Sequence, residues 1–286
     1  MKTTIQLLSA ITIMYAVVLF SACDKVDGPY SESIQTPVIG DDTVRKVLLE
    51  DYTGHKCQGC PAAHDEANTI QQVLGEQVVV MTVHAGFWTS VNTTGSFTYD
   101  FKNPTSTELY NALVPSTQPF PTGTVDCKMY GVNRIVDYPK WGGKIDSLLQ
   151  QAPDAYVKIT PGYDAANRTI TASVKTDILN DLTGDVTMAI YYTEDSIINW
   201  QAFPAPPAGI GNISNYVHRH VLRGALTTTW GDVIATNPVQ GQSFNTNKTS
   251  TAIAADINPA HVHVVAVLSN SVTREVIQVE EVKLIP

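Results

Sequence analysis

Two cysteines, Cys57 and Cys60, are the residues of this sequence best suited to chemistry. They are separated by two residues, a spacing at which paired thiols can close a small, reducible disulfide. Pro61 follows directly, and proline suits the first turn of a helix because its missing N–H would be unpaired there. A helix N-terminus stabilises a thiolate through its free N–H groups and its dipole. We therefore predict thiol–disulfide chemistry, with Cys57 as the more exposed nucleophile and Cys60 as the resolving thiol.

The segments around this pair predict a βαβ unit that positions it. Residues 45–51 are rich in aliphatic side chains and precede a Thr-Gly turn, which indicates a short strand. From Cys57 to about Gly75, apolar residues recur at intervals of three and four, which predicts a helix. Residues 77–84 form a continuous apolar run, typical of a strand buried on both faces. The pair is thus expected where the helix begins.

Other interpretations of the cysteine pair have to be weighed. A zinc site needs a second ligand pair, and the sequence offers only His55 and His64 beside the motif, so a mixed Cys2His2 site is the weaker alternative. Haem attachment is excluded because Pro61, not histidine, follows the second cysteine. A structural disulfide is the stronger alternative, since exported proteins form disulfides readily, although closing so short a loop stabilises little. Cys127 is predicted to be a buried free thiol.

The N-terminus predicts export. Lys2 precedes an almost uninterrupted apolar stretch, Ile5 to Phe20, which is shorter than the ~20 residues of a membrane-spanning helix. The stretch ends in small residues before Cys23, an arrangement that resembles the bacterial lipobox. We expect a lipoprotein signal peptide over residues 1–22, lipidation at Cys23, and a flexible tether over residues 23–43. An ordinary cleavage site beside a coincidental cysteine is the alternative.

Composition narrows the function classes. The 286-residue chain carries 27 acidic and 18 basic side chains, a net charge of −9, which argues against binding to nucleic acid. Its hydrophobic content of 43% excludes a disordered chain and, with one short apolar stretch, a protein with many membrane spans. No cofactor is predicted.

The last part of the chain, residues 153–286, predicts a different architecture. About seven short β-branched or alternating runs, separated by turns and without a helical pattern, favour an immunoglobulin-like β-sandwich. The expected strands are Tyr156–Thr160, Thr169–Lys175, Val186–Tyr192, Val217–Leu222, Ala252–Ile257, His261–Leu268 and Glu275–Leu284. Residues 200–212 are expected to form a long loop, solvent-exposed by default, with contact to the first domain or to a partner as the alternative. The predicted fold class is therefore α/β plus all-β.

Two His-x-His pairs lie on these expected strands. His218 and His220 would share one face of a strand, as would His261 and His263, because side chains alternate. Four imidazoles could face a metal if the strands were neighbours. Nothing in the sequence fixes that pairing, so ordinary surface or core histidines are the favoured interpretation, and no metal is predicted.

The CxxC motif together with a later Pro-Phe-Pro-Thr segment resembles the thioredoxin-like superfamily. In that superfamily a cis-proline loop packs against the CxxC motif and presents backbone groups to a substrate peptide, and Pro121 and Thr122 match this loop. The resemblance implies a thioredoxin-like domain over residues 44–152, with an insertion over residues 85–118. It also implies substrate binding at Pro121 and Thr122.

The whole mature chain resembles the outer-membrane-protein-twenty-eight-related lipoproteins of Gram-negative bacteria. The Tyr-Val-His-Arg-His-Val-Leu-Arg stretch, residues 216–223, is the segment that points to this family. The resemblance implies a lipid-anchored outer-membrane protein, periplasmic or surface-exposed, with a thioredoxin-like domain. The CxxC pair predicts that this domain exchanges disulfides with exported proteins. The alternative is a surface adhesin in which the β-sandwich recognises a protein or a glycan.

Overall fold

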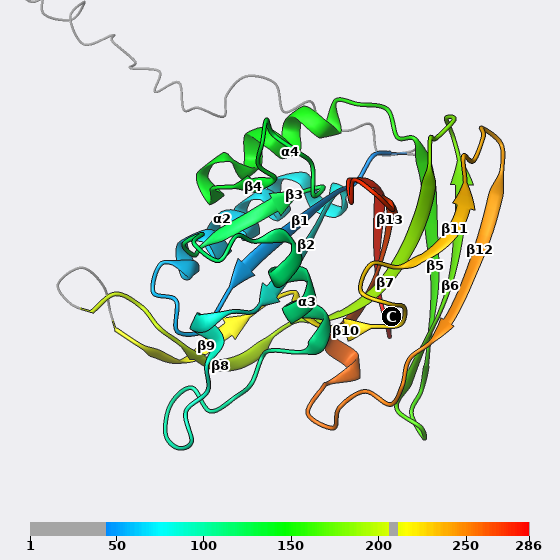
Figure 1. The fold of residues 1–286 in the computed structure, drawn as a ribbon. Helices are drawn as coiled ribbons and strands as arrows, with labels where there is room; N and C mark the ends of the chain where they lie inside the picture. Colours follow the sequence, from blue (N-terminus) through cyan, green and yellow to red (C-terminus); the bar gives the residue numbers. More distant parts are fainter. Residues whose placement is uncertain (1–43, 206–210, 286) are drawn as a thin grey trace, which may run out of the picture. The chain divides into compact units, whose positions relative to one another are not determined.

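The computed structural model describes residues 44–205 and 211–285. These described residues belong to one compact unit, which is drawn as a ribbon in Figure 1. The predicted signal peptide, the lipidation site Cys23 and the tether lie outside the described residues.

Fourteen strands and three α-helices make up the described part of the chain. The helices are α2 (Cys60–Leu74), α3 (Pro104–Leu113) and α4 (Trp141–Leu149). The first half contains the strands β1 (Val47–Thr53), β2 (Val78–His84), β3 (Thr122–Val125) and β4 (Ile135–Val136). The second half contains β5 (Ala155–Asp164), β6 (Thr169–Ile178), β7 (Asp185–Glu194), β8 (Ile197–Gln201), β9 (Ile213–His218), β10 (Val221–Ala225), β11 (Asp232–Thr236), β12 (Ser243–Thr249), β13 (Val262–Asn270) and β14 (Val276–Lys283).

A single large sheet joins the two halves. Its strand order is β14-β13-β7-β10-β2-β1-β3-β4, with β11 paired to β7. β1 and β2 are parallel, as a βαβ unit requires, and β3 runs antiparallel to β1. The halves meet where β10 pairs in parallel with β2 at Val221 and Thr82. The predicted domain boundary at residue 152 therefore falls between α4 and β5, while strands from both of its sides belong to one sheet (Figure 1).

Helices cover both faces of the first half of this sheet. Strand β2 is buried along its whole length because α2 and α4 pack on one face and α3 on the other. Helix α3 begins with a capping box between Asn103 and Ser106, and Pro104 occupies its first turn. Helix α3 thus lies within residues 85–118.

The second half adds another layer. Strands β12, β6 and β5 form a three-stranded sheet, and Figure 1 shows it beside β7 and β13. Residues of β6 alternate between buried and exposed, so one face of this sheet packs on the apolar core and the other meets solvent. The coarse prediction of an α/β part followed by a β-rich part is confirmed.

Several local predictions were wrong. Residues 252–257 form no strand. The strand expected over residues 217–222 is two strands, β9 and β10, because the backbone turns at His220, where φ is +52°. Strands β8, β11 and β12 were missed; β12 is short and polar and pairs only with β6, so it lacks the apolar signal of a core strand.

Candidate functional site

Cys57 and Cys60 form a disulfide at the N-terminus of α2. Cys57 lies in the turn after β1, and Cys60 is the first residue of the helix, with 5.4 Å between their Cα atoms. The exposed fraction is 3% for Cys57 and 0% for Cys60. Cys57 is thus the more exposed of the two, as expected, but only slightly, because other parts of the chain cover it.

Pro121 lies against the turn that carries the disulfide. The Phe120–Pro121 peptide bond is cis. A Cβ placed on Gly59 would come 3.3 Å from Cδ of Pro121, so the turn and the proline are in close contact. Thr122 begins β3 and is fully buried, and its hydroxyl has no hydrogen-bond partner among the described residues. The structure thus brings together all four residues that the sequence singled out in the folded part of the chain.

Asp51 is a candidate functional residue that sequence reasoning missed. It is 1% exposed, and neither carboxyl oxygen has a hydrogen-bond partner among the described residues. Its side chain shares a face of β1 with Val47 and Leu49, the face on which α2 packs. Burial raises the pKa of Asp51 from 3.8 to about 8, so the carboxyl is mainly protonated at neutral pH. The sequence signal that could have identified Asp51 is its spacing of two and four residues from Leu49 and Val47, which places all three side chains on one face of the strand.

His64 lies between Asp51 and the second half of the chain. It follows Cys60 by four residues on α2 and therefore lies on the same side of the helix. Its Nε2 is 3.5 Å from Oδ2 of Asp51 and 3.0 Å from the hydroxyl of Thr53, and its Nδ1 is 2.7 Å from the hydroxyl of Tyr216. Burial lowers the pKa of His64 to about 4, so the imidazole is neutral beside a protonated carboxyl.

Three further histidines are buried around Phe101. The ring of His84 stacks on Phe101 with centroids 4.5 Å apart, His218 lies 4.5 Å away, and His55 lies 5.6 Å away. Burial lowers the pKa of each of these imidazoles. Both ring nitrogens of His84 lack a hydrogen-bond partner within the described chain. These three imidazoles are therefore buried and neutral at neutral pH.

The histidines do not form a metal site. In the ranges 44–205 and 211–285, no three His, Cys, Asp or Glu side chains are grouped so that they could hold a metal ion. His218 ends β9 whereas His220 lies in the turn that follows, and His261 lies in a short 3-10 helix before the strand that carries His263. The strand alternation on which the four-imidazole alternative depended is thus absent.

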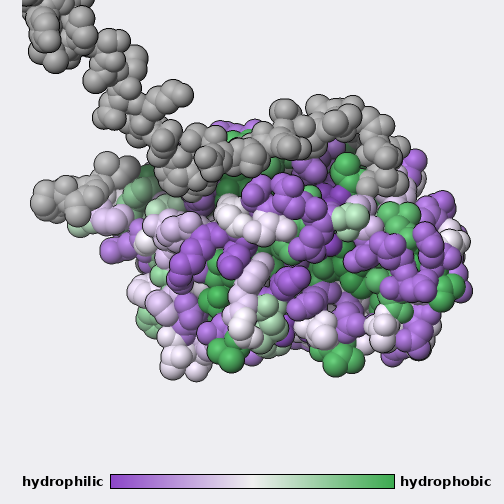
Figure 2. Space-filling model, turned by 90° about the horizontal axis from the view of Figure 1, so that it is seen from above, coloured by the Kyte–Doolittle hydropathy of each residue, from purple (hydrophilic) through white to green (hydrophobic). Residues whose placement is uncertain are grey.

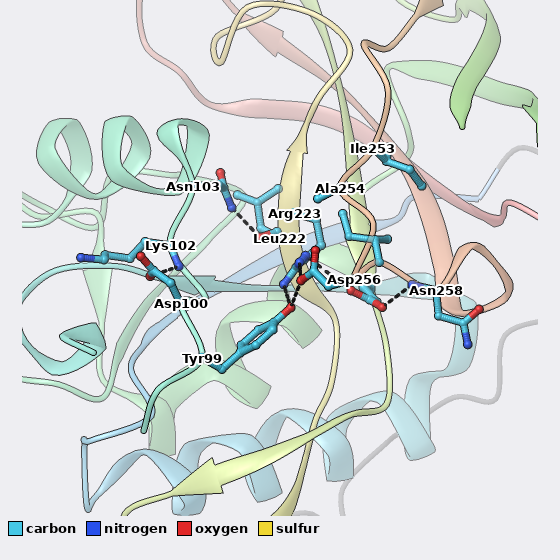
Figure 3. A network of polar contacts seen from close by, with 12 residues as sticks. Tyr99, Asp100, Lys102, Asn103, Leu222, Arg223, Ile253, Ala254, Asp256 and Asn258 are labelled. Carbon is cyan, nitrogen blue, oxygen red and sulfur yellow. Dashed lines mark hydrogen bonds and ion pairs between the residues drawn. The ribbon is translucent and has the colours of Figure 1, made fainter. Parts of the chain in front are cut away.

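Residues 99–103 are connected to the second half of the chain by a polar network (Figure 3). The hydroxyl of Tyr99 donates to Oδ2 of Asp256 at 2.6 Å and accepts from the guanidinium of Arg223, also at 2.6 Å. Arg223 donates to Asp256 at 2.8 Å, and its Nε is 3.4 Å from a carboxyl oxygen of the buried Glu194. Asn103, at the start of α3, donates to the carbonyl of Leu222 at 2.7 Å. These contacts hold the insertion against β10.

Cys127 is the free thiol that the sequence predicts. It is buried just beyond β3 rather than within it, on the sheet face covered by α3. Burial raises its pKa to about 12, and Arg134 donates to its Sγ at 3.0 Å. It is therefore protonated at neutral pH and separate from the disulfide.

No helix in the described part of the chain is long and apolar enough to cross a membrane. On the part of the surface visible in Figure 2, hydrophobic residues are scattered among hydrophilic ones.

One family model and several solved structures are similar to this chain. The family model described as "Outer membrane protein Omp28" matches residues 109–286. HBP35 of Porphyromonas gingivalis is 21% identical with a TM-score of 0.63, and the match covers 84% of this chain and 76% of that one. Protein AGR_C_4864 from Agrobacterium tumefaciens is 13% identical with a TM-score of 0.49, covering 84% and 95%. A domain of the outer membrane lipoprotein Omp28 from P. gingivalis is 18% identical with a TM-score of 0.32, covering 46% and 88%. No curated protein matches the chain.

Proposed function

The chain belongs to the Omp28 family of outer membrane proteins, and we propose that it exchanges disulfides with exported proteins in the cell envelope. The reacting groups are Cys57 and Cys60. The observation that carries the proposal is the disulfide at the N-terminus of α2, in a turn that lies against Pro121 at Gly59.

The arrangement of elements supports a thioredoxin-like assignment for residues 44–152. β1, α2 and β2 form a parallel βαβ unit, and the cis-proline precedes β3, which is antiparallel to β1. The layer of β5, β6 and β12 supports an immunoglobulin-like assignment for residues 153–286. A lipid on Cys23 would hold both parts at the membrane.

The exchange proceeds in two displacements. A thiolate of an exported protein attacks Sγ of Cys57, a new S–S bond forms, and the Cys57–Cys60 bond breaks with Cys60 leaving as a thiolate. A second thiolate of the exported protein then attacks its own sulfur in this mixed disulfide and releases Cys57. The exported protein has lost two electrons and gained a disulfide, while the pair, once protonated, holds two thiols. The same steps in reverse reduce a disulfide.

Asp51 supplies and accepts a proton in this scheme. Its carboxyl lies under α2 on the side that carries Cys60 and His64, and it is protonated at neutral pH because it is buried. A protonated acid can donate to the Cys60 thiolate as that group leaves, and the carboxylate can take the proton back in the reverse direction. Asp51 is thus a positioned acid and base for the resolving thiol.

Pro121 and Thr122 are proposed to hold the backbone of the exported protein by strand-like hydrogen bonds. The exposed surface nearby is partly apolar: Phe87 is 77% exposed and Trp88 41%, and the carbonyl of Trp88 accepts from the amide of Lys56, the residue before Cys57. An extended polypeptide with an apolar residue near its cysteine fits this surface.

An insulin-reduction assay with dithiothreitol as the electron source, together with refolding of a scrambled disulfide protein, tests the proposal. We expect turnover by the full mature chain, loss of that turnover in Cys57→Ser, and retention in Cys127→Ser, which removes the free thiol alone. Turnover in Cys57→Ser equal to that of the unchanged protein would contradict the proposal. It would favour recognition of a surface protein or glycan by the β-sandwich.

A further inference from the structure

A segment of the second half of the chain covers the disulfide. The amide of Ala202 donates to the carbonyl of His55 at 2.7 Å, and Nε2 of Gln201 donates to the carbonyl of Cys57 at 2.9 Å. Gln201 is fully buried and Ala202 is 6% exposed. These two residues therefore occupy the main-chain acceptors beside Cys57 and account for part of its burial.

The two residues belong to a hairpin that is separate from the large sheet. β8 and β9 pair only with each other, and they leave and re-enter the main sheet between β7 and β10. Ile198 is 66% exposed and Val217 is 38% exposed, so the outer side of the hairpin faces solvent. We call residues 197–202 and 213–218 the cover.

The cover is held to the first half by a small number of polar and aromatic contacts. The hydroxyl of Tyr216 is 2.7 Å from His64, and the ring of His218 lies 5.5 Å from that of His84 and 4.5 Å from that of Phe101. The ring of Trp200 lies 6.0 Å from that of Phe97 in the insertion. The apolar clusters that form the cores contain none of the cover's side chains.

The closed arrangement also leaves polar groups without partners. Oε1 of Gln201 and Nδ1 of His218 are buried and have no hydrogen-bond partner among the described residues. A buried polar atom without a partner destabilises the state that contains it, and water satisfies both atoms once the segment swings out. Segments with few apolar contacts and unsatisfied polar groups open at lower free energy than the core.

We propose that the β8–β9 cover occupies the polypeptide-binding side of the CxxC turn, and that an exported protein gains access to Cys57 by displacing it. The carbonyl of His55 now accepts from Ala202 and that of Cys57 from Gln201. Main-chain amides of an extended polypeptide would donate to these two carbonyls instead. This rests on the proposed function for its biological meaning. The occlusion itself is a property of the disulfide and can be measured without any protein substrate.

The test follows reduction of Cys57–Cys60 by dithiothreitol in the full mature chain. One dithiothreitol thiolate bonds to a cysteine sulfur and releases the other cysteine, and the second thiolate displaces the first cysteine, which leaves cyclic oxidised dithiothreitol and two protein thiols. The thiols are alkylated at timed intervals and counted by mass spectrometry. Gln201→Met keeps the length of the side chain but removes the donor to Cys57, and it should speed reduction about tenfold, which equals about 1.4 kcal/mol of opening free energy.

Ile198→Ser is the matched control, because it changes an exposed residue of the same strand and should leave the rate unchanged. Equal rates in Gln201→Met and the unchanged protein would overturn the proposal. If Gln201→Met does not fold, a second measurement tests the same proposal. In the unchanged protein, urea below the unfolding transition should accelerate reduction and amide hydrogen exchange at Ala202 by the same factor. Exchange that accelerates while reduction does not would also overturn the proposal.

The outcomes separate this proposal from the proposed function. Faster reduction in Gln201→Met without insulin turnover in any variant retains the cover and rejects exchange with exported proteins. Insulin turnover, together with equal rates of reduction by dithiothreitol in Gln201→Met and the unchanged protein, would support exchange with exported proteins and overturn the cover.

Discussion

The disulfide end of the molecule and the core of its β-rich half are both buried, yet they are built from different groups. The core between β5, β6, β7 and β13 consists mainly of aliphatic side chains. The buried side-chain atoms on these strands without a hydrogen-bond partner belong to Thr176 and, near the ends of β7 and β13, to Thr193, Glu194 and His263. At the disulfide end, buried polar atoms without partners recur. They belong to Asp51, His55, His84, Thr122, Gln201 and His218.

This difference locates the function. An aliphatic core stabilises the fold by removing apolar surface from water. Unsatisfied buried polar groups lower stability, and proteins retain them where chemistry or binding requires them. The β-rich core should therefore respond to substitution through stability alone, and the disulfide end through reactivity and pH dependence.

The largest effect is expected from Cys60→Ser at the disulfide end. In the reducing direction, Cys57 attacks a disulfide of an exported protein, and Cys60 then displaces that protein from Cys57. Without Cys60, Cys57 should remain joined to the exported protein as a mixed disulfide. Non-reducing electrophoresis followed by mass spectrometry would detect the adduct. Its absence in Cys57→Ser is the control, and equal adducts in both variants would contradict the assignment of roles.

Ile170→Ala in the β-rich core should lower the free energy of unfolding by about 2–5 kcal/mol, because it leaves a cavity in a fully buried aliphatic cluster. Urea unfolding measures the loss. The reduction potential of Cys57–Cys60 should not change, and a shift in that potential would show that the two regions are not distinct in the way described.

Asp51→Asn should change how stability depends on pH. The pKa of Asp51 is raised from 3.8 to about 8, so its favourable contribution is complete below pH 3.8 and is lost as the pH rises through 8. Between about pH 5 and pH 8, the unchanged protein should lose about 2–4 kcal/mol relative to Asp51→Asn. The buried histidines titrate in both proteins and cancel in this difference. Identical pH profiles would mean that Asp51 is not a buried, protonated acid.

The smallest effect is expected in the network of Figure 3. Tyr99→Phe removes one donor and one acceptor but leaves the contact between Arg223 and Asp256, so it should cost about 1 kcal/mol of unfolding free energy. Tyr138→Phe, at a hydroxyl without a hydrogen bond in the described structure, is the control in the same urea titration. Equal stabilities of the two variants would mean that this network does not fasten the insertion.

Local patterns in the sequence predicted the elements that carry the cysteines. Helix α2 follows from apolar periodicity and strand β2 from a continuous apolar run, whereas Pro121 was identified through the resemblance to the thioredoxin-like superfamily. Asp51 was missed although it continues the alternation of β1, because adjacent acidic residues at a strand end are usually exposed.

The cover could not be predicted, because it depends on contacts between distant residues. Gln201 lies 144 positions from Cys57 in the sequence. It stands at the edge of a segment expected to be a solvent-exposed loop, and neither periodicity nor composition marks it. The joining of β10 to β2 is likewise a single parallel pairing, at Val221 and Thr82, without a sequence signature. The described structure was needed for both.

The reduction potential of Cys57–Cys60 in the full mature chain tests the central claim most directly. Equilibration with dithiothreitol or glutathione buffers, followed by alkylation and mass spectrometry, measures it. A pair that exchanges with exported proteins should lie between about −270 and −120 mV, the range of exchange-active dithiols. A value below about −300 mV, typical of structural disulfides, would contradict the account.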